Sequence, residues 1–364
     1  MKKKHEQDLS SLRNQIDAID SKILDLINQR LDIGKQVGCI KAETGSKILD
    51  RSRETKVIEN LFKLNHGPAS KELLQYVFNV IIAATREIQR PKTISFLGPQ
   101  ATYSHIAALN HFQHSGLFIE HPNLYEVFRQ VDRNESHFGV VPIENSTEGA
   151  VNHTLDLFTE FNLNICAEHY EPVSHDLLSL TGEAKDVKTI ISHPQPIAQC
   201  RTWIRNKFGH AKIIEASSTS KAALLASEDK HIAAIASKQA AHLYGLQAIE
   251  SKIEDRSGNI TRFLVIGKEP PKRTGNDKTS IMFATPHVPG ALFKALEPID
   301  RAGLNMLKLE SRPTHHQNWS YYFFVDIAGH HTDEIVSKTI EELKNYALSL
   351  KILGSYPVAA TKDK

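Results

Sequence analysis

Residues 12–41 read LRNQIDAIDSKILDLINQRLDIGKQVGCIK, and the spacing of their apolar side chains predicts one long helix. The apolar positions recur in alternating steps of four and three residues, so at about 100° per residue they share one face. Arg30 falls in the middle of this apolar stripe, and Lys41 returns to nearly the same angle. A buried cation is costly without an opposite charge, and no acidic residue shares the stripe. We therefore expect an anionic ligand beside Arg30 and Lys41. The stripe consists of Leu12, Ile16, Ile19, Ile23, Leu26, Arg30, Ile33 and Val37.

The helical pattern extends on both sides of this stretch, up to about residue 90. It breaks at Gly45 and at His66-Gly67-Pro68, and it stops at Pro91, because glycine and proline end helices. Leu9 to Glu43 alone would form a helix on the order of 50 Å long. Two shorter helices cannot cover it, so we expect a dimer to complete the core.

Length and composition limit the classes of protein to which the chain can belong. With 364 residues, the chain can form two or three domains. The net charge of +2 is too small to produce a positive electrostatic potential that would attract nucleic acid. No apolar run approaches membrane-spanning length, and the basic start lacks the apolar run of a signal peptide. The 3 cysteines are odd in number and widely spaced, which suits a reducing compartment. We expect a cytoplasmic protein with no nucleic-acid or membrane partner. None of the 19 histidines has metal-ligand spacing, so we expect no metal.

From residue 94 onward, short β-rich runs alternate with helical stretches. This alternation predicts an α/β domain with a largely parallel sheet, whose ligands bind at the strand ends. Polar tracts rich in Ser, Thr and Asn follow three of the runs, at residues 98–105, 142–149 and 217–220. Their exposed amides suit a carboxylate-bearing ligand, although helix capping alone explains Ser104 and Thr219 equally well. The expected strands are 94–97, 138–141, 164–167, 189–192, 232–236 and 263–266.

A third pattern follows residues 268–278, which are rich in Pro, Lys and Gly and resemble a linker. Residues 279–356 predict the order strand, helix, strand, strand, helix, strand. This is the ferredoxin-like arrangement of an α+β domain. The order of elements does not identify a ligand.

The helical segment has further polar side chains on an otherwise apolar helix face and at a helix start. Thr85 and Gln89 share a face with the apolar Phe78 and Ile81, while Asp50 stands at a helix start. Singly, these positions and the pair Arg53-Glu54 fit an ordinary solvated surface. Together, the cations, carboxylates and amide or hydroxyl donors converge without a metal or an evident nucleophile.

This set resembles the all-helical chorismate mutase domain over about the first 90 residues. The resemblance implies a dimeric helical bundle in which Arg30 and Arg53 bind the carboxylates of chorismate and Arg13 reaches across from the partner. Other residues would complete the site. Lys41 and Gln89 would donate to the ether oxygen, Asp50 and Glu54 would contact the ring hydroxyl, and Thr85, where the family more often has serine, would contact a carboxylate. A fixed array of donors suffices to catalyse a pericyclic rearrangement.

The central segment resembles prephenate dehydratase in three tracts, residues 141–146, 192–196 and Thr261-Arg262-Phe263. The resemblance implies a bilobed fold like that of type II periplasmic binding proteins, with prephenate between the lobes. Thr261 would donate the proton to the leaving hydroxyl, with an efficiency that depends on Arg262 and a dry cleft. The sequence departs from the family at Ala101, where glycine is common. The implied prephenate contacts are Ser104, Asn145, Ser146, Gln195, Thr261, Arg262 and Phe263.

The C-terminal segment resembles the ACT domain attached to prephenate dehydratases. The resemblance is carried by Gly290-Ala291-Leu292 and by Glu310-Ser311-Arg312-Pro313, and it implies a phenylalanine site between two subunits. Gly290 would allow close backbone approach, and Glu310 and Ser311 would come from the facing subunit. A dimerisation module without a ligand is the alternative.

The three segments together resemble the bifunctional chorismate mutase/prephenate dehydratase family, or P-proteins. The resemblance implies an isomerase and a lyase of phenylalanine biosynthesis, inhibited by phenylalanine, with no cofactor and with domains at residues 1–91, 92–268 and 279–358. No Gly-x-Gly-x-x-Gly follows a strand, which disfavours a mutase fused to an NAD-dependent dehydrogenase. Two alternatives stay open: an amino acid sensor with degenerate catalytic sites, and a dehydratase whose helical segment only dimerises.

Overall fold

The computed structural model describes residues 2–43, 51–89, 92–113, 116–313 and 321–359. It divides into two compact units, residues 1–91 and residues 92–364, and each is described by itself. In the described residues, no helix is both long and apolar enough to cross a membrane.

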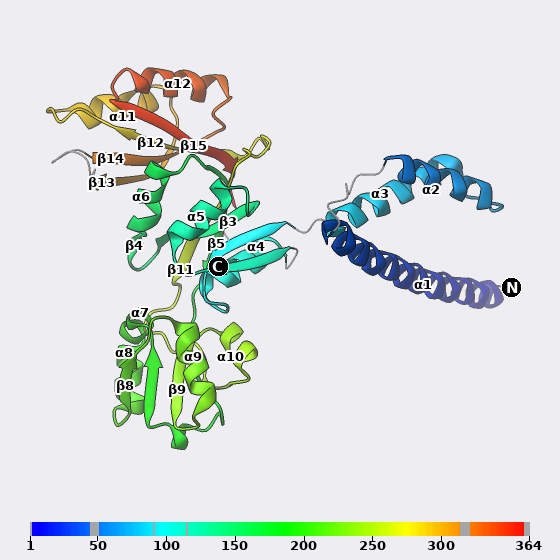
Figure 1. Ribbon diagram of the computed structural model, residues 1–364, viewed down its shortest axis with the longest axis horizontal. Helices are drawn as coiled ribbons and strands as arrows, with labels where there is room; N and C mark the ends of the chain where they lie inside the picture. Colours follow the sequence, from blue (N-terminus) through cyan, green and yellow to red (C-terminus); the bar gives the residue numbers. More distant parts are fainter. Residues whose placement is uncertain (1, 44–50, 90–91, 114–115, 314–320, 360–364) are drawn as a thin grey trace. The chain divides into compact units, whose positions relative to one another are not determined.

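The first unit is helical, as predicted. Its long helix α1 (Lys2–Glu43) is followed by α2 (Arg51–Leu64) and α3 (Lys71–Gln89), and α3 packs against α1 (Figure 1). Gly34 of α1 lies so close to α3 that an added Cβ would overlap Thr85 Cγ2. The apolar stripe stays open in a single chain, since its Leu and Ile members are 49% to 63% exposed.

The first lobe of the second unit contains a sheet in the order β2-β1-β3-β11-β5, with β4 paired to β3. β1 runs parallel to β2 and β3, whereas β11 runs antiparallel to β3 and β5. The strands are β1 (Thr93–Leu97), β2 (Leu117–His121), β3 (Phe138–Asn145), β4 (Gly149–Ala150), β5 (Asn164–Pro172) and β11 (Ile260–Gly267). The helices are α4 (Tyr103–His111), α5 (Leu124–Asp132) and α6 (Asn152–Glu160).

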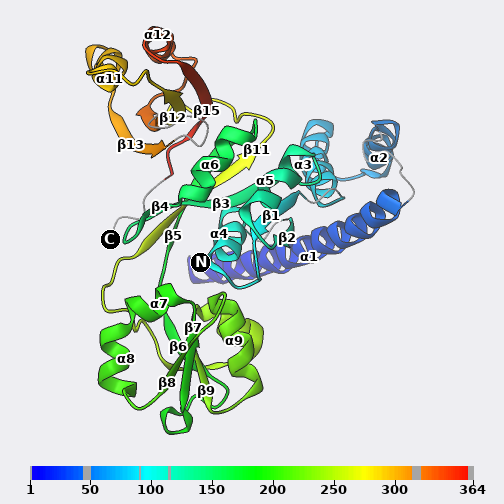
Figure 2. The same cartoon turned by 60° about the vertical axis from the view of Figure 1, so that its left-hand side comes forward.

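The second lobe is inserted between β5 and β11 and contains a sheet in the order β10-β6-β9-β7-β8. Its strands are β6 (Asp176–Ser179), β7 (Thr189–Ser192), β8 (Lys212–Glu215), β9 (Ile232–Ala236) and β10 (Gln247–Glu250), and a 3-10 turn covers Ala184–Asp186. Its helices are α7 (Pro194–Gln199), α8 (Arg201–Phe208), α9 (Thr219–Glu228) and α10 (Lys238–Tyr244). Two separate apolar clusters, one with α8 and one with α9, cover the two faces of this sheet (Figure 2).

The expectation of one largely parallel sheet is wrong. Both sheets are mixed, because the chain leaves the first lobe after β5 and returns as β11, which enters the first sheet antiparallel. In the second lobe, β6 runs antiparallel to β9 and β10. The two crossings at residues 173–175 and 251–259 make the bilobed arrangement.

The C-terminal residues form the predicted order of strands and helices. The sheet order is β13-β14-β12-β15, and alternate residues of β12 divide between its two faces. Ile281 and Phe283 pack against α11 and α12, whereas Met282 joins the core of the first lobe. The first lobe and the C-terminal sheet therefore share one apolar core. The elements are β12 (Asp277–Ala284), α11 (Ala291–Arg301), β13 (Met306–Pro313), β14 (Tyr321–Ala328), α12 (Glu334–Lys344) and β15 (Ser349–Pro357).

Candidate functional site

A cavity of about 600 Å³ lies between the two lobes of the second unit, a volume suited to a small organic ligand. Both lobes line it. The first lobe contributes Ser104, Asn145 and Thr261, and the second contributes Gln195 and Thr219.

Three helices present their first turns to this cavity. Ser104 and Gln195 are the second residues of α4 and α7, and Thr219 is the first residue of α9. The side-chain caps of α4 and α9 are the neighbouring Thr102 and Ser218, so capping does not account for Ser104 or Thr219. Free N–H groups in the first turns of α4 and α9 attract carboxylates. The first turn of α7 offers none, because Pro194 and Pro196 lack an N–H and that of Gln195 donates to His193 Nδ1 at 3.4 Å. Among the described lining residues there is no lysine or arginine, so the donors available for an anion are backbone N–H groups, hydroxyls, side-chain amides and the histidine rings.

A set of hydrogen bonds fixes the hydroxyl of Thr261. Asn145 Oδ1 accepts from the backbone N–H groups of Thr147 at 3.0 Å and Glu148 at 3.3 Å. The amide nitrogen of Asn145 must therefore face the other way, where it donates to Thr261 Oγ1 and Asn259 Oδ1, each at 2.8 Å. Since Thr261 Oγ1 accepts this bond, its own proton is free to be donated into the cavity.

The same set continues to a buried histidine. Asn259 Nδ2 donates to Gln199 Oε1 at 3.4 Å, and His175 Nε2 lies 2.8 Å from the same oxygen. A carbonyl oxygen can only accept, so Nε2 carries the proton. His175 Nδ1 is buried with no hydrogen-bond partner in the described part of the chain. Burial lowers the pKa of His175, which favours the neutral imidazole.

The loop before α4 connects the two lobes beside the cavity. Ala101 adopts a left-handed conformation with φ of 62°, which costs a residue with a Cβ about 1 kcal/mol or more. The carbonyl of Ala101 accepts from Ser237 Oγ of the second lobe at 3.1 Å, and its N–H donates to His105 Nδ1 at 3.0 Å. These bonds hold the backbone in the conformation that glycine adopts without strain.

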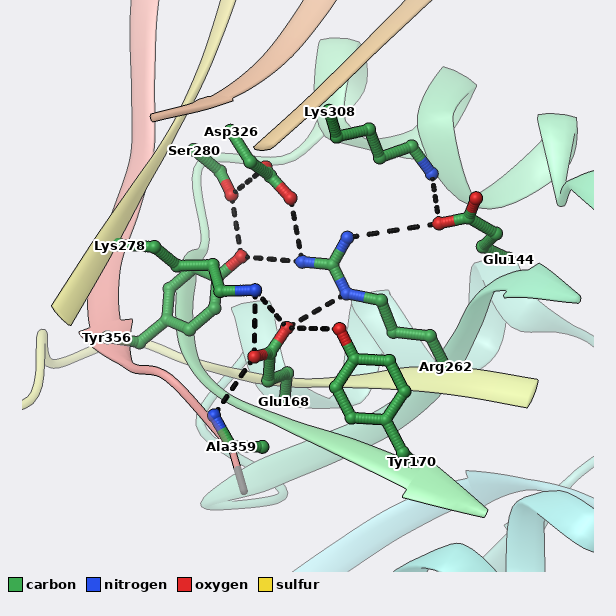
Figure 3. Close-up of polar contacts among 10 residues, drawn as sticks. All are labelled: Glu144, Glu168, Tyr170, Arg262, Lys278, Ser280, Lys308, Asp326, Tyr356 and Ala359. Atoms are coloured by element: carbon green, nitrogen blue, oxygen red, sulfur yellow. Dashed lines mark hydrogen bonds and ion pairs between the residues drawn. The ribbon is translucent and has the colours of Figure 1, made fainter. Parts of the chain in front are cut away.

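Arg262 points away from the cavity. Thr261 and Phe263 line the cavity, and side chains alternate along a strand, so Arg262 lies on the opposite face of β11. Its Nε donates to Glu168 Oε2 at 2.9 Å and its Nη2 donates to Asp326 Oδ2 at 2.8 Å (Figure 3). The expected contact between Arg262 and a ligand in the cleft disagrees with this placement.

A second cavity of about 510 Å³ lies at the start of α11, in the C-terminal part. Gly290, Ala291 and Leu292 line it, together with apolar and aromatic side chains that include Phe293 and Phe323. Gly290 has φ of 78°, and a Cβ there would meet no atom within 4 Å.

The other residues predicted for this ligand lie on β13. Glu310 and Ser311 do not line the cavity within one chain. Arg312 instead forms a two-point ion pair with Asp156 of α6, with distances of 2.9 and 2.6 Å. The expected role of Arg312 at the cavity disagrees with this pairing.

In the helical unit, the cation on the apolar stripe meets α3. Arg30 Nη1 donates to Thr85 Oγ1 and, at 3.4 Å, to the carbonyl of Ile81. Arg30 is half-buried and Thr85 is buried. Arg53 and Glu54 lie on α2, and Arg13 is exposed on α1. Asp50 lies outside the described residues, as do the side chains of Lys41 and Gln89.

Three family descriptions match the chain in order. They are Chorismate mutase type II over residues 12–90, Prephenate dehydratase over residues 94–271 and the ACT domain over residues 279–345. A bifunctional chorismate mutase/prephenate dehydratase of Aquifex aeolicus is 40% identical over 361 residues, covering 98% of this chain and 100% of that protein. The chain belongs to the bifunctional chorismate mutase/prephenate dehydratase family.

Two solved structures resemble this member of the family in fold. A prephenate dehydratase from Arthrobacter aurescens, determined in complex with L-Phe, has a TM-score of 0.67 and 33% identity and covers 73% of this chain and 90% of its own. GqqA, described as a novel type of quorum quenching acylase, has a TM-score of 0.68 and 29% identity and covers 74% of this chain and 98% of its own. Because one fold hosts several chemistries, the full-length relatives and the site decide the activity.

The dehydratase cleft contains five of the seven residues that the sequence suggested for it. Ser104, Asn145, Gln195, Thr261 and Phe263 line the cavity. Ser146 is exposed and does not line it, although its Oγ accepts from the N–H of Ile260 at 3.0 Å.

Sequence reasoning missed three residues of the hydrogen-bonded set around Thr261: His175 and Gln199, which line the cavity, and Asn259, which connects them to Asn145. Asn259 precedes Thr261 by two positions, and that spacing places both on one face of extended chain. This signal was available in the sequence. His175 and Gln199 gave no such signal, because they approach the cleft from separate segments.

Proposed function

We propose how the residues of this chain perform the two reactions of its family. The helical unit rearranges chorismate to prephenate, the cleft converts prephenate to phenylpyruvate, and phenylalanine binds at the cavity near Gly290 and inhibits the enzyme. The orientation of Asn145 toward Thr261, which leaves the threonine proton free, carries this proposal most directly.

In the cleft, prephenate lies with its carboxylates at the first turns of α4 and α9. Thr261 hydrogen-bonds to the ring hydroxyl and passes its proton to it as it leaves as water, and a proton from solvent then restores the threonine hydroxyl. The ring carboxylate leaves as carbon dioxide, and the electron pair of its broken bond completes the aromatic ring. Free threonine is a weak acid, so its contribution is a directed hydrogen bond in a site shielded from water. Ser104, Asn145 and Gln195 hold the substrate.

In the helical unit, Arg30 and Arg53 bind the substrate carboxylates, with Arg13 supplied by a second copy. Lys41 and Gln89 donate to the ether oxygen as its bond breaks, Asp50 and Glu54 contact the ring hydroxyl, and Thr85 contacts a carboxylate. The bond from Arg30 to Thr85 supports this assignment, because it shows how a cation on the apolar stripe is held in place.

The enzyme is a homodimer. Leu12, Ile19 and Leu26 are 57%, 54% and 63% exposed, and an open stripe of this length calls for a partner of the same pattern. Leu26→Glu should dissociate the dimer, as measured by analytical ultracentrifugation, and abolish mutase turnover. Leu24 is 59% exposed but lies off the stripe, so Leu24→Glu is the matched control. A dimer that persists in Leu26→Glu would contradict this assembly.

The enzyme belongs to a reducing, cytoplasmic compartment. Cys166 and Cys200 are free and buried. Burial raises their pKa values to about 11 and about 12, so both stay as unreactive thiols. Fractionation of cells that express the chain would locate it.

The experiment that tests the proposal supplies the purified chain with chorismate alone. Chorismate, prephenate and phenylpyruvate are measured with and without phenylalanine. We expect phenylpyruvate to form and phenylalanine to suppress it. Accumulation of prephenate would leave only the mutase, and no turnover with phenylalanine still bound would favour a sensor. Phenylpyruvate formed from prephenate but not from chorismate would mean that the helical unit only dimerises.

A further inference from the structure

Arg262 joins the strand that carries Thr261 to the C-terminal sheet. Its Nε donates to Glu168 of β5, and its Nη2 donates to Asp326 of β14 at 2.8 Å and to Tyr356 of β15 at 3.0 Å (Figure 3). One guanidinium therefore connects β11 and β5 of the first lobe with two strands of the C-terminal sheet.

The hydrogen bonds on the C-terminal side close into a ring in which Arg262 donates on both sides and Asp326 accepts on both sides. Arg262 can only donate, so Tyr356 Oη accepts from it and donates to Ser280 Oγ at 2.7 Å. Ser280 in turn donates to Asp326 Oδ1 at 2.5 Å, and Asp326 Oδ2 accepts from Arg262. The two hydrogens of Arg262 Nη2 and the hydroxyl hydrogens of Tyr356 and Ser280 each have one acceptor, so the ring specifies one relative position of the strands.

The ring lies in a buried cluster of balanced charge. Lys278 Nζ lies 2.8 and 2.9 Å from the two oxygens of Glu168. The cluster thus pairs two cations, Arg262 and Lys278, with two carboxylates, Glu168 and Asp326. The side chains of all four are at most 10% exposed. Removal of one buried partner leaves an unpaired charge, so the cluster holds its geometry firmly.

Two of the three C-terminal strands of this cluster, β14 and β12, also lead to the cavity near Gly290. β14 carries Asp326 and, toward its other end, the cavity-lining Phe323 and Tyr321. β12 carries Ser280 and is followed by the cavity-lining Thr285. Five residues of extended strand span about 17 Å. A ligand that displaces these strands at the cavity therefore acts on the Arg262 ring through continuous backbone.

On the other side of the ring, Arg262 directly follows Thr261. β11 pairs Thr261 with Asn145 and Arg262 with Glu144. Because adjacent residues share one peptide unit, a displacement of Arg262 moves Thr261 relative to Asn145. That movement changes the hydrogen bond that leaves the threonine proton free.

We propose that Arg262 is a positioning residue that couples occupancy of the cavity near Gly290 to the placement of Thr261, and that it does not contact prephenate. The proposal rests on the function proposed above, since it explains how bound phenylalanine lowers dehydratase activity. Coupling of this kind requires that phenylalanine bind one arrangement of the strands better than the other.

The test breaks the ring from the C-terminal side and leaves Arg262 in place. Asp326→Asn removes a charge at constant shape, and Tyr356→Phe is a milder variant that removes one hydroxyl. In both, we expect saturating phenylalanine to inhibit prephenate turnover less completely, with the residual activity about tenfold above that of inhibited wild type in Asp326→Asn. Phenylalanine binding, measured by equilibrium dialysis, and the KM for prephenate should stay within about twofold of wild type. Unchanged phenylalanine binding, together with prephenate turnover in the absence of phenylalanine, reports that the second unit of each variant is folded.

The matched control is Asp156→Asn, which breaks the ion pair with Arg312 between the same two parts of the chain. It should leave inhibition unchanged. Equal loss of inhibition in this control would show general loosening and overturn the proposal, as would normal inhibition in both ring variants. In Arg262→Lys, a raised KM with intact inhibition would show a substrate contact and also overturn it. Failure of the proposed function looks different, because wild type itself would then show no phenylalanine-inhibited turnover.

Discussion

The two catalytic regions differ in what one copy of the chain provides. The dehydratase cleft is built within a single chain, and its Thr261 and Asn145 are each 8% exposed. In the helical unit, Ile16 and Leu26 are 56% and 63% exposed, so the apolar face of α1 is uncovered in one copy of the chain. We infer that the dehydratase site depends on folding alone, whereas the mutase site depends on folding and association.

The largest effect that separates the two regions should come from Thr261→Ala. This change removes the hydroxyl that Asn145 orients, and we expect phenylpyruvate formation to fall by at least about 1,000-fold, the upper range for loss of one transition-state donor. Mutase turnover, measured by chorismate loss, should stay normal. Thr261→Ser keeps a hydroxyl and should retain measurable activity. Loss of both activities in Thr261→Ala would indicate global damage instead.

The reciprocal change is Lys41→Ala in the mutase region. Loss of the donor to the ether oxygen should cost about 3 kcal/mol of transition-state stabilisation, or about 150-fold in kcat/KM for chorismate. Conversion of prephenate to phenylpyruvate should not change. Lys35→Ala, at an exposed position of the same helix, is the matched control. Near-normal mutase turnover in Lys41→Ala would refute the assignment.

The same contrast explains which features could be predicted from the sequence. The apolar residues of 12–41 repeat with a clear helical period, and no strand or turn pattern interrupts them. The extent of the helix and the position of Arg30 on its apolar face could therefore be predicted. The central sheet was misjudged because β11 looks like any buried strand. Nothing local in Leu264 or Val265 reveals that the chain has returned from a second lobe. Sheet direction depends on pairing between distant segments, which periodicity does not encode.

The two faces of β11 show how far the roles of the site residues could be predicted from the sequence. The motif Thr261-Arg262-Phe263 was expected at the start of a strand over residues 263–266, whereas β11 begins earlier, at Ile260, and contains all three residues. Once they lie in a strand, alternation assigns the middle residue to the other face. The partners of that residue, Glu168 and Asp326, lie 94 and 64 positions away along the chain. An arginine beside a catalytic threonine therefore suggested substrate binding until the acceptors on the far face were located.

A smaller effect should sharpen the comparison on the helical side. In Gly34→Ala, the added Cβ overlaps Thr85 Cγ2, so we expect a destabilisation of about 1–3 kcal/mol despite the better helix propensity of alanine. The thermal midpoint for loss of mutase activity measures it. The second unit should be unaffected, as reported by Trp203 fluorescence. Thr85→Ser removes the overlapping methyl, so the double variant Gly34→Ala/Thr85→Ser should recover stability. A double variant as unstable as Gly34→Ala would rule out this contact as the cause.

The smallest expected effect concerns pH and the second unit alone. Burial and the nearby His169 lower the pKa of His111 from 6.5 to about 4. Between these values the unfolded chain binds a proton that the folded chain does not, so the free energy of unfolding falls as the pH falls. His111→Phe cannot bind this proton in either state. The variant should therefore lose less stability between pH 6.5 and about 4, as measured by urea unfolding with Trp203 fluorescence.

The matched control for this prediction is His153→Phe, at an exposed position of α6, whose acid sensitivity should equal that of wild type. An unchanged pH dependence in His111→Phe would mean that His111 takes up its proton in the folded state as readily as in the unfolded one. Mutase inactivation should keep its own pH dependence in both variants, since His111 belongs to the other unit. A matching shift in mutase stability would show that the two units unfold together, and the contrast between a folding-dependent and an association-dependent site would then need revision.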